Sequence, residues 1–203
     1  LVLFGGAAAL SYQTAIEVLD GYSAKWGFSW GDMGANILGV SACVLQEKFF
    51  NKQIVHIKIF SAGKVKYEPA LQERAEFLFG KNFTSRLLND YNAQTYWTSV
   101  NIKDLVPRLK VPAWFNIALG YGAHNMLGET NNSWMNKGEM VDRSDLRRYG
   151  RFLLSPDIDL SRIKTKKAWL RTLLLIANAI KIPAPALEYN RQKGFRMHAL
   201  LLN

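Results

Sequence analysis

The stretch AWFNIALGYGA, residues 113–123, alternates between two kinds of side chain and therefore predicts a β-strand. Its large apolar or aromatic residues fall on one face: Phe115, Ile117, Leu119 and Tyr121. Its small or polar residues fall on the other: Asn116, Ala118, Gly120 and Gly122. This is the pattern of an outer-membrane strand. It is also the pattern of a half-buried strand that packs against a crowded layer. On the alternation alone, we favour this second interpretation.

Further strand patterns flank this stretch, at residues 53–60, 65–69, 95–102 and 148–160 and in a closing hairpin around the turn RQKG at 191–194. Helical patterns cover about 70–92 and 164–182, and a long polar loop covers 123–147. We therefore predict an α+β fold: an N-terminal antiparallel helical hairpin, then antiparallel β-strands, possibly barrel-like, and an amphipathic C-terminal helix. The predicted domains are residues 1–51 and 52–203.

The N-terminal region has the pattern of two helices. The first covers residues 3–20, and Ser29 caps a second helix that runs to about Phe50. Gly31, Ala35 and Gly39 form a small-residue series, which predicts that the second helix approaches its partner closely through them. The chain opens inside an apolar run, so we expect a processed chain or a fragment. We expect no spanning helix, because no uninterrupted apolar run reaches about 20 residues.

Four polar residues are expected to meet where the two helices join: Glu17, Asp20, Asp32 and Asn36. Buried carboxylates need partners, such as a cation, a shared proton or a basic residue from elsewhere. The three acids are candidate ligands for Ca²⁺ or Mg²⁺, and with Asn36 they are candidates for acid–base catalysis. The alternative is a polar network that fixes the helix register, with Asp32 mainly in the capping turn.

The chain is basic, with 26 Lys and Arg against 16 Asp and Glu, which suits an anionic lipid, a nucleic acid or an acidic partner. Lys164, Lys166 and Lys167 lie at the N-terminus of the helix predicted at 164–182 and oppose its dipole, and Trp169 follows them. An anionic membrane surface would favour this arrangement; the alternative is a core helix with a solvated first turn. A second basic cluster interleaves with aromatic residues: Arg143, Arg147, Arg148, Arg151, Tyr149 and Phe152. No nucleic-acid motif accompanies it, so we expect a membrane-facing belt rather than a nucleic-acid site.

Signatures of common catalytic sites are missing from the sequence. It contains no Walker loop, no G-x-S-x-G, no H-E-x-x-H and no C-x-x-C motif. Its three histidines are isolated along the chain: His56, His124 and His198. We therefore expect no cofactor and no serine- or zinc-based hydrolysis.

Three segments resemble the YfiM-like family of predicted periplasmic lipoproteins, whose function is uncharacterised: residues 14–39, residues 87–103 and residues 115–128. The first 50 residues also have a weaker similarity to VanZ-like membrane proteins. The resemblance implies a secreted precursor and a location in the periplasm or at the periplasmic face of the outer membrane. Glu17, Asp20, Asp32 and Asn36 match the polar motif of the family, for which no catalytic residues are established.

The favoured hypothesis is a non-enzymatic cell-envelope accessory protein that docks on a larger outer-membrane complex, such as a type IX secretion machine. The surface expected to meet lipid or that complex comprises Trp169, Lys164, Lys166, Lys167, Phe115 and Tyr121. One alternative is a membrane-proximal hydrolase that uses Glu17, Asp20 and Asp32. A second alternative is a small free-standing outer-membrane β-barrel. No nucleic-acid partner is expected.

Overall fold

The computed structural model describes residues 2–22, 27–63, 65–128, 131–136 and 138–200. The chain divides into two compact units, Leu1–Ile54 and Val55–Asn203. The first unit is helical. The second unit contains all the strands of the described residues, so the α+β fold class is confirmed.

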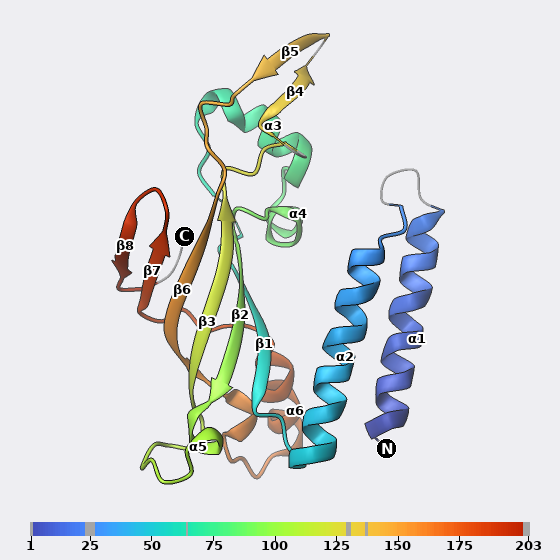
Figure 1. The fold of residues 1–203 in the computed structure, drawn as a ribbon, viewed down its shortest axis with the longest axis vertical. Helices are drawn as coiled ribbons and strands as arrows, with labels where there is room; N and C mark the ends of the chain where they lie inside the picture. The colour runs from blue at the N-terminus through green and yellow to red at the C-terminus, as the bar shows by residue number, and fades with distance from the viewer. Residues whose placement is uncertain (1, 23–26, 64, 129–130, 137, 201–203) are drawn as a thin grey trace. The chain divides into compact units, whose positions relative to one another are not determined.

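The first unit is an antiparallel pair of helices, α1 (Val2–Gly21) and α2 (Trp30–Phe50) (Figure 1). Ser29 caps α2 as predicted, because its Oγ accepts a hydrogen bond from the backbone N of Asp32 at 3.2 Å. At the other end of α2, Asn51 adopts a left-handed conformation with φ of 52°, and its N–H donates to the Glu47 carbonyl.

The two helices are in tight contact at Gly6 of α1. A Cβ atom on Gly6 would stand 2.6 Å from Cγ2 of Val44, so a larger residue at position 6 would clash with that side chain unless one of them shifted. The predicted contact through Gly31, Ala35 and Gly39 is wrong: a Cβ on Gly39 would meet nothing within 4 Å, and one on Gly31 would meet only its own capping residue, Ser29. Gly39 lines a hollow together with Gly5 and Gly6 of α1, so the spacing identified a residue on the side of α2 that faces α1 but not the point of tight contact.

Helix α1 is long and apolar enough to cross a membrane, judged by length and composition. It has 20 residues, a mean hydropathy of 1.3, and only 6% of it is buried. The expectation that no segment qualifies is therefore wrong: Gln13 and Glu17 interrupt the apolar run but not the helix. An apolar N-terminal helix of this kind is consistent with a signal sequence or a single membrane anchor.

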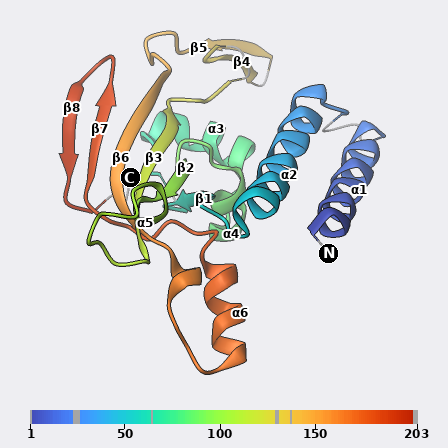
Figure 2. The ribbon, with the colours of Figure 1, turned by 60° about the horizontal axis from the view of Figure 1, so that its bottom comes forward.

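The second unit is built on a six-stranded antiparallel sheet with the order β1-β2-β3-β6-β7-β8. Its strands are β1 (Val55–Ser61), β2 (Gln94–Asn101), β3 (Phe115–His124), β6 (Tyr149–Ile158), β7 (Ala186–Asn190) and β8 (Gly194–His198). Figure 2 shows them as one curved sheet. The sheet is not closed into a barrel, because β1 and β8 do not pair with each other in the described part of the chain.

Short elements complete this unit: α3 (Pro69–Phe79), α4 (Phe83–Asn89), α5 (Ile102–Leu105), the 3-10 turn η1 (Leu160–Arg162) and α6 (Ala168–Ala177). The strand expected at 65–69 does not form, because residues 65–68 are irregular and Pro69 starts α3. The loop 123–147 contains the hairpin β4 (Ser133–Asn136) and β5 (Glu139–Asp142). Helix α6 is shorter than the predicted 164–182, since it begins only after Lys167.

The two faces of the sheet have opposite chemistry. One face, here called the apolar face, is exposed and includes Ile57, Ile117, Leu119, Tyr121, Phe152, Leu154, Leu187, Tyr189, Phe195 and Met197. The other, here called the polar face, is buried and includes Lys58, Thr95, Ser99, Asn101, Asn116, Arg151, Ser155, Asp157, Glu188 and Asn190. Buried polar side chains outnumber buried apolar ones among the described residues. This distribution is the reverse of a soluble sheet.

A small apolar cluster crosses the middle of the polar face and includes one residue from each of five strands: Phe60, Trp97, Ala118, Leu153 and Ala186. Gly120 of β3 pairs with Trp97 in the register of β2 and β3, and a Cβ on Gly120 would stand 2.8 Å from the indole ring. Trp97 is 1% exposed, so its ring has little room to move. Position 120 of the alternating stretch therefore requires a glycine, because any side chain there would overlap the buried Trp97 ring.

We expect Gly120→Ala to destabilise the sheet by roughly 1–3 kcal/mol, because the methyl group overpacks against Trp97. Thermal unfolding in mild detergent, followed by the β-sheet circular dichroism signal, measures this. Gly34→Ala in α2 is the control: its Cβ would meet nothing within 4 Å and alanine favours a helix interior, so this variant should not lower the melting temperature of the sheet. An unchanged melting temperature for Gly120→Ala would show that the two strands are not packed in this way.

Candidate functional site

The acidic residues singled out from the sequence lie near the end of α1 and the start of α2, but they differ in burial. Glu17 is buried and its Oε2 has no hydrogen-bond partner among the described residues, whereas Asp32 is exposed in the capping turn of α2. Asp20 and Asn36 are partly exposed. Within the described ranges, no three Asp, Glu, His or Cys side chains gather in a way that could hold a metal ion.

A first polar network lies at the end of the polar face where β6 finishes. Asp157 is central to it: its Oδ2 is 2.8 Å from Nζ of Lys58 and accepts a hydrogen bond from Ser99 Oγ at 2.5 Å. Nζ of Lys181 lies 3.6 Å from the other carboxylate oxygen. Burial lowers the pKa of Lys181, and the attraction of Asp157 opposes that shift. Through these contacts, Asp157 of β6 links Lys58 of β1 to Lys181, which lies in the segment before β7.

Asp159 extends this network beyond the end of β6. Its Oδ2 lies 3.1 Å from His56 Nε2 and accepts a hydrogen bond from Arg162 Nε at 2.9 Å, while Ser161 donates to Oδ1. Burial alone would raise the pKa of Asp159, but the hydrogen bonds from His56 and Ser161 outweigh it and hold the pKa well below its usual range. Arg162 also pairs with Asp104 of α5.

These groups do not form an activated nucleophile. Ser99 lies opposite His56 in the strand register, but its hydroxyl donates to Asp157 and accepts from Asn116 at 2.9 Å. The hydroxyl is thus engaged by a carboxylate and an amide rather than by a histidine base. This network ties strands together.

A second network lies at the opposite end of the polar face. His198 Nε2 is 2.9 Å from Oε2 of Glu188, and Arg151 Nη1 is 3.7 Å from the same oxygen. Arg151 Nη2 also donates to Thr95 Oγ1 at 3.0 Å, and Asn190 donates to Glu188. His56 and His198, which are isolated along the chain, are therefore each hydrogen-bonded to a carboxylate, and the charges buried under the sheet are compensated.

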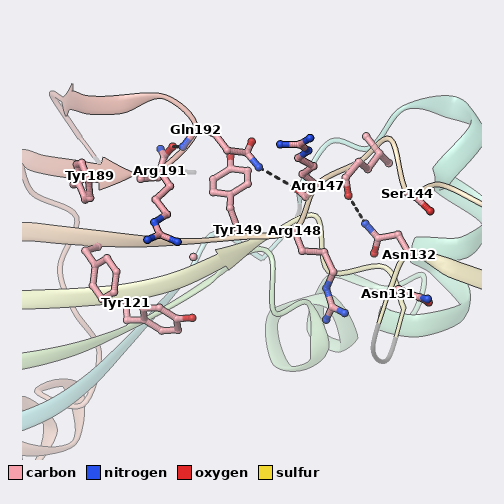
Figure 3. Close-up of a pocket in the computed structure, with 14 residues that line it drawn as sticks. Tyr121, Asn131, Asn132, Ser144, Arg147, Arg148, Tyr149, Tyr189, Arg191 and Gln192 are labelled. Carbon is pink, nitrogen blue, oxygen red and sulfur yellow. Dashed lines mark hydrogen bonds between the residues drawn. The ribbon is translucent and has the colours of Figure 1, made fainter.

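The candidate site is a pocket of about 790 Å³ beside this second network, where β6 begins and the β7–β8 turn lies (Figure 3). Its walls carry Arg147, Arg148, Arg191, Tyr121, Tyr149 and Tyr189, together with several amide side chains. None of its described lining residues is acidic. Such a pocket can attract and hydrogen-bond an anion.

Amide side chains hold the walls of this pocket in place. Asn132 donates to the carbonyls of Asn125 and Leu146 at 2.9 and 2.7 Å. The carbonyl of Arg147 accepts from Asn125 Nδ2 at 3.0 Å. In the β7–β8 turn, Asn190 Oδ1 accepts from the backbone of Gln192 and Lys193, which sets the position of Arg191. The backbone at Arg147 and around Arg191 is therefore fixed by hydrogen bonds from amide side chains.

Arg147, Arg148, Tyr149 and Phe152 of the basic, aromatic cluster expected from the sequence line the pocket together, but the cluster's other two arginines do not. Arg143 pairs with Asp145 through Nε at 2.9 Å, and Arg151 is buried. Arg191 and Tyr189 were not anticipated. The RQKG turn was the available signal, since its register sets Arg191 beside the start of β6, where Asn190 pairs with Arg151.

The residues expected to meet lipid or a partner lie at the surface, and their role stays a prediction. Tyr121 is 50% exposed on the apolar face and Phe115 is partly buried at its edge. Lys164, Lys166 and Lys167 are exposed before α6, and Lys167 Nζ lies 6.0 Å from the ring centre of Trp169.

Asp159→Asn should lower the free energy of unfolding at pH 7 by roughly 2 kcal/mol, because it removes a charged acceptor from a part-buried network. The folded-state pKa is depressed, so this stabilisation is complete above about pH 5 and is lost as the pH falls towards the folded pKa. Urea unfolding at pH 7, 5 and 3 measures the difference between wild type and variant. Glu139→Gln, an exposed acid on β5, is the control. A difference that grows on acidification would contradict the assignment.

No protein-family model, curated protein or solved structure matches this chain.

Proposed function

We propose that this protein is a non-enzymatic envelope protein of the outer membrane, whose apolar face lies against lipid and whose open sheet edge docks on a larger membrane complex. The observation that carries the proposal is the inverted sheet: apolar residues outside and paired charges beneath.

The apolar face is too large for the surface of an ordinary soluble monomer. Leu119 and Phe152 are each 60% exposed, and Met197 is 83% exposed. Tyr121 and Phe152 contact one another across the sheet, with ring centres 5.4 Å apart. The surface continues over all six strands, and contiguous apolar patches of this kind mark membrane or partner contacts.

The strand lengths fit the hydrocarbon of an outer membrane. Strands β3 and β6 have 10 residues each and pair along their whole length. A spanning β-strand needs about 9–11 residues when tilted, to cross an apolar band about 25 Å tall. The two central strands therefore match the lipid dimension that their exposed face requires.

Aromatic and basic residues lie at both ends of the apolar face. At one end are Tyr121, Tyr189, Arg147 and Arg191. At the other is Trp114, and helix α6, which carries Trp169 and follows the three lysines, lies near the same end of β6 (Figure 1). Aromatic rings and cationic side chains favour the boundary between hydrocarbon and water. They therefore bracket the face at the positions of the two membrane interfaces.

The open sheet favours docking on a complex over a free-standing barrel. Strand β8 pairs with β7 on one side, and no described strand pairs with its other side. Lipid cannot hydrogen-bond unpaired backbone groups, so an edge strand at membrane depth needs a partner. A strand or loop of a larger outer-membrane assembly would supply it, and the type IX secretion machine is one such assembly.

A lipid-depth measurement tests the membrane contact. In a Cys43→Ala background, Leu119→Cys and Glu139→Cys are labelled with a polarity-sensitive dye and reconstituted in neutral vesicles. We expect nitroxide groups on lipid acyl chains to quench the dye at position 119 strongly, and the dye on β5 at position 139 weakly. Equal, weak quenching at both positions would refute contact of the apolar face with hydrocarbon.

Photo-crosslinking in native envelopes tests the docking edge. With p-benzoylphenylalanine at Arg196 of β8, we expect a single product with an integral outer-membrane protein. The same label at Met140, exposed on the β4–β5 hairpin, should give no such product. Products at Arg196 only with periplasmic chaperones, or none at all, would count against docking through β8.

A further inference from the structure

We propose that the arginine-lined pocket binds the phosphate-bearing headgroup of an anionic lipid, whose acyl chain lies on the adjoining aromatic residues of the apolar face. This inference deepens the proposed function and rests on it. The shared chemistry is a phosphate ester, and a water-soluble phosphate compound is the competing source.

The charge of the pocket favours an anion. Arg147 and Arg191 have no carboxylate partner in the described part of the chain, and both line the pocket. The acids nearest along the chain are already engaged: Asp145 by a two-bond fork from Arg143, at 2.9 Å for each bond, and Glu188 by His198 and Asn190. Two uncompensated guanidinium groups around one cavity suit a phosphate, which both can hydrogen-bond.

The surroundings of the arginines favour an amphiphile over a free anion. Tyr121, Phe152 and Tyr189 line the pocket and also belong to the apolar face, so the cavity opens onto that face without a polar break. Gly150 lies between them, and a Cβ there would stand 3.1 Å from the Tyr121 ring. A ligand with an acidic head and an apolar tail would satisfy both parts of this surface.

The pocket stands where a headgroup would be. It lies where β3 ends and β6 begins, at one edge of the ten-residue stretch that fits the hydrocarbon. Figure 3 shows Arg147 and Arg191 on either side of Tyr149 in that view, above the strands that carry the apolar face. A lipid whose tails follow the apolar face would therefore present its phosphate to these two arginines.

Native mass spectrometry of the full chain in a neutral detergent tests this. We expect phosphatidylglycerol to bind at least about tenfold more tightly than phosphatidylcholine, and Arg147→Gln/Arg191→Gln to abolish that preference. Lys66→Gln/Lys81→Gln is the control, because it removes the same charge from exposed positions outside the pocket. Equal binding of the two lipids by wild type, or an unchanged preference in the arginine variant, would overturn the proposal.

A second variant separates the two sources of phosphate. Phe152→Ala should weaken binding of phosphatidylglycerol several-fold and leave binding of glycerol phosphate unchanged, because only the lipid has a tail to lose. If glycerol phosphate displaces the lipid at equal concentration and Phe152→Ala has no effect, the pocket serves a soluble phosphate compound and the lipid assignment fails. These measurements use no bilayer, so their failure is distinct from failure of the depth measurement at Leu119.

Discussion

The rest of the structure depends on one buried interaction on the polar face: the carboxylate of Asp157 forms an ion pair with Lys58 and accepts a hydrogen bond from Ser99. Strand side chains alternate in direction, so a buried charge at one position determines the face of every neighbour. With Asp157 and Arg151 turned inward on β6, Phe152 and Leu154 must face outward. Removing one partner of such a pair leaves the other charge buried and unpaired, which costs several kcal/mol. The paired charges thus hold the apolar residues outside, which is favourable only against lipid or a partner.

The alternation of residues 113–123 was sufficient to predict β3 and its two faces, because period-two patterning is a local property. The cap at Ser29, the two N-terminal helices and the RQKG hairpin were also readable from short segments. Which face would be buried was not readable. That depends on pairs such as Lys58 with Asp157, which lie far apart in the chain, and the pattern alone favoured the opposite interpretation, with the large residues packed inside.

The same distinction between local and long-range information explains the errors. Gly31, Ala35 and Gly39 have the right spacing for a helix contact, but the tight contact that the structure shows is between Gly6 and Val44. Residues 65–68 alternate like a strand and find no partner strand in the described chain, so Pro69 starts a helix there. Of the candidate pocket, Arg147, Arg148 and Tyr149 were visible as a basic, aromatic cluster. Arg191 joins them only through the pairing of β6 with β7.

The central claim is that the apolar face of the sheet contacts hydrocarbon while the polar face stays dry and paired. Nuclear Overhauser contacts to methyl groups in lipid nanodiscs measure this most directly, because neighbouring residues of β6 report on opposite faces. The account predicts cross-peaks from acyl-chain protons to the methyl groups of Leu119, Leu154 and Leu187, and none to Leu153, which is 3% exposed on the polar face. Cross-peaks from water, rather than from lipid, to the methyl groups of Leu119 and Leu154 would contradict it.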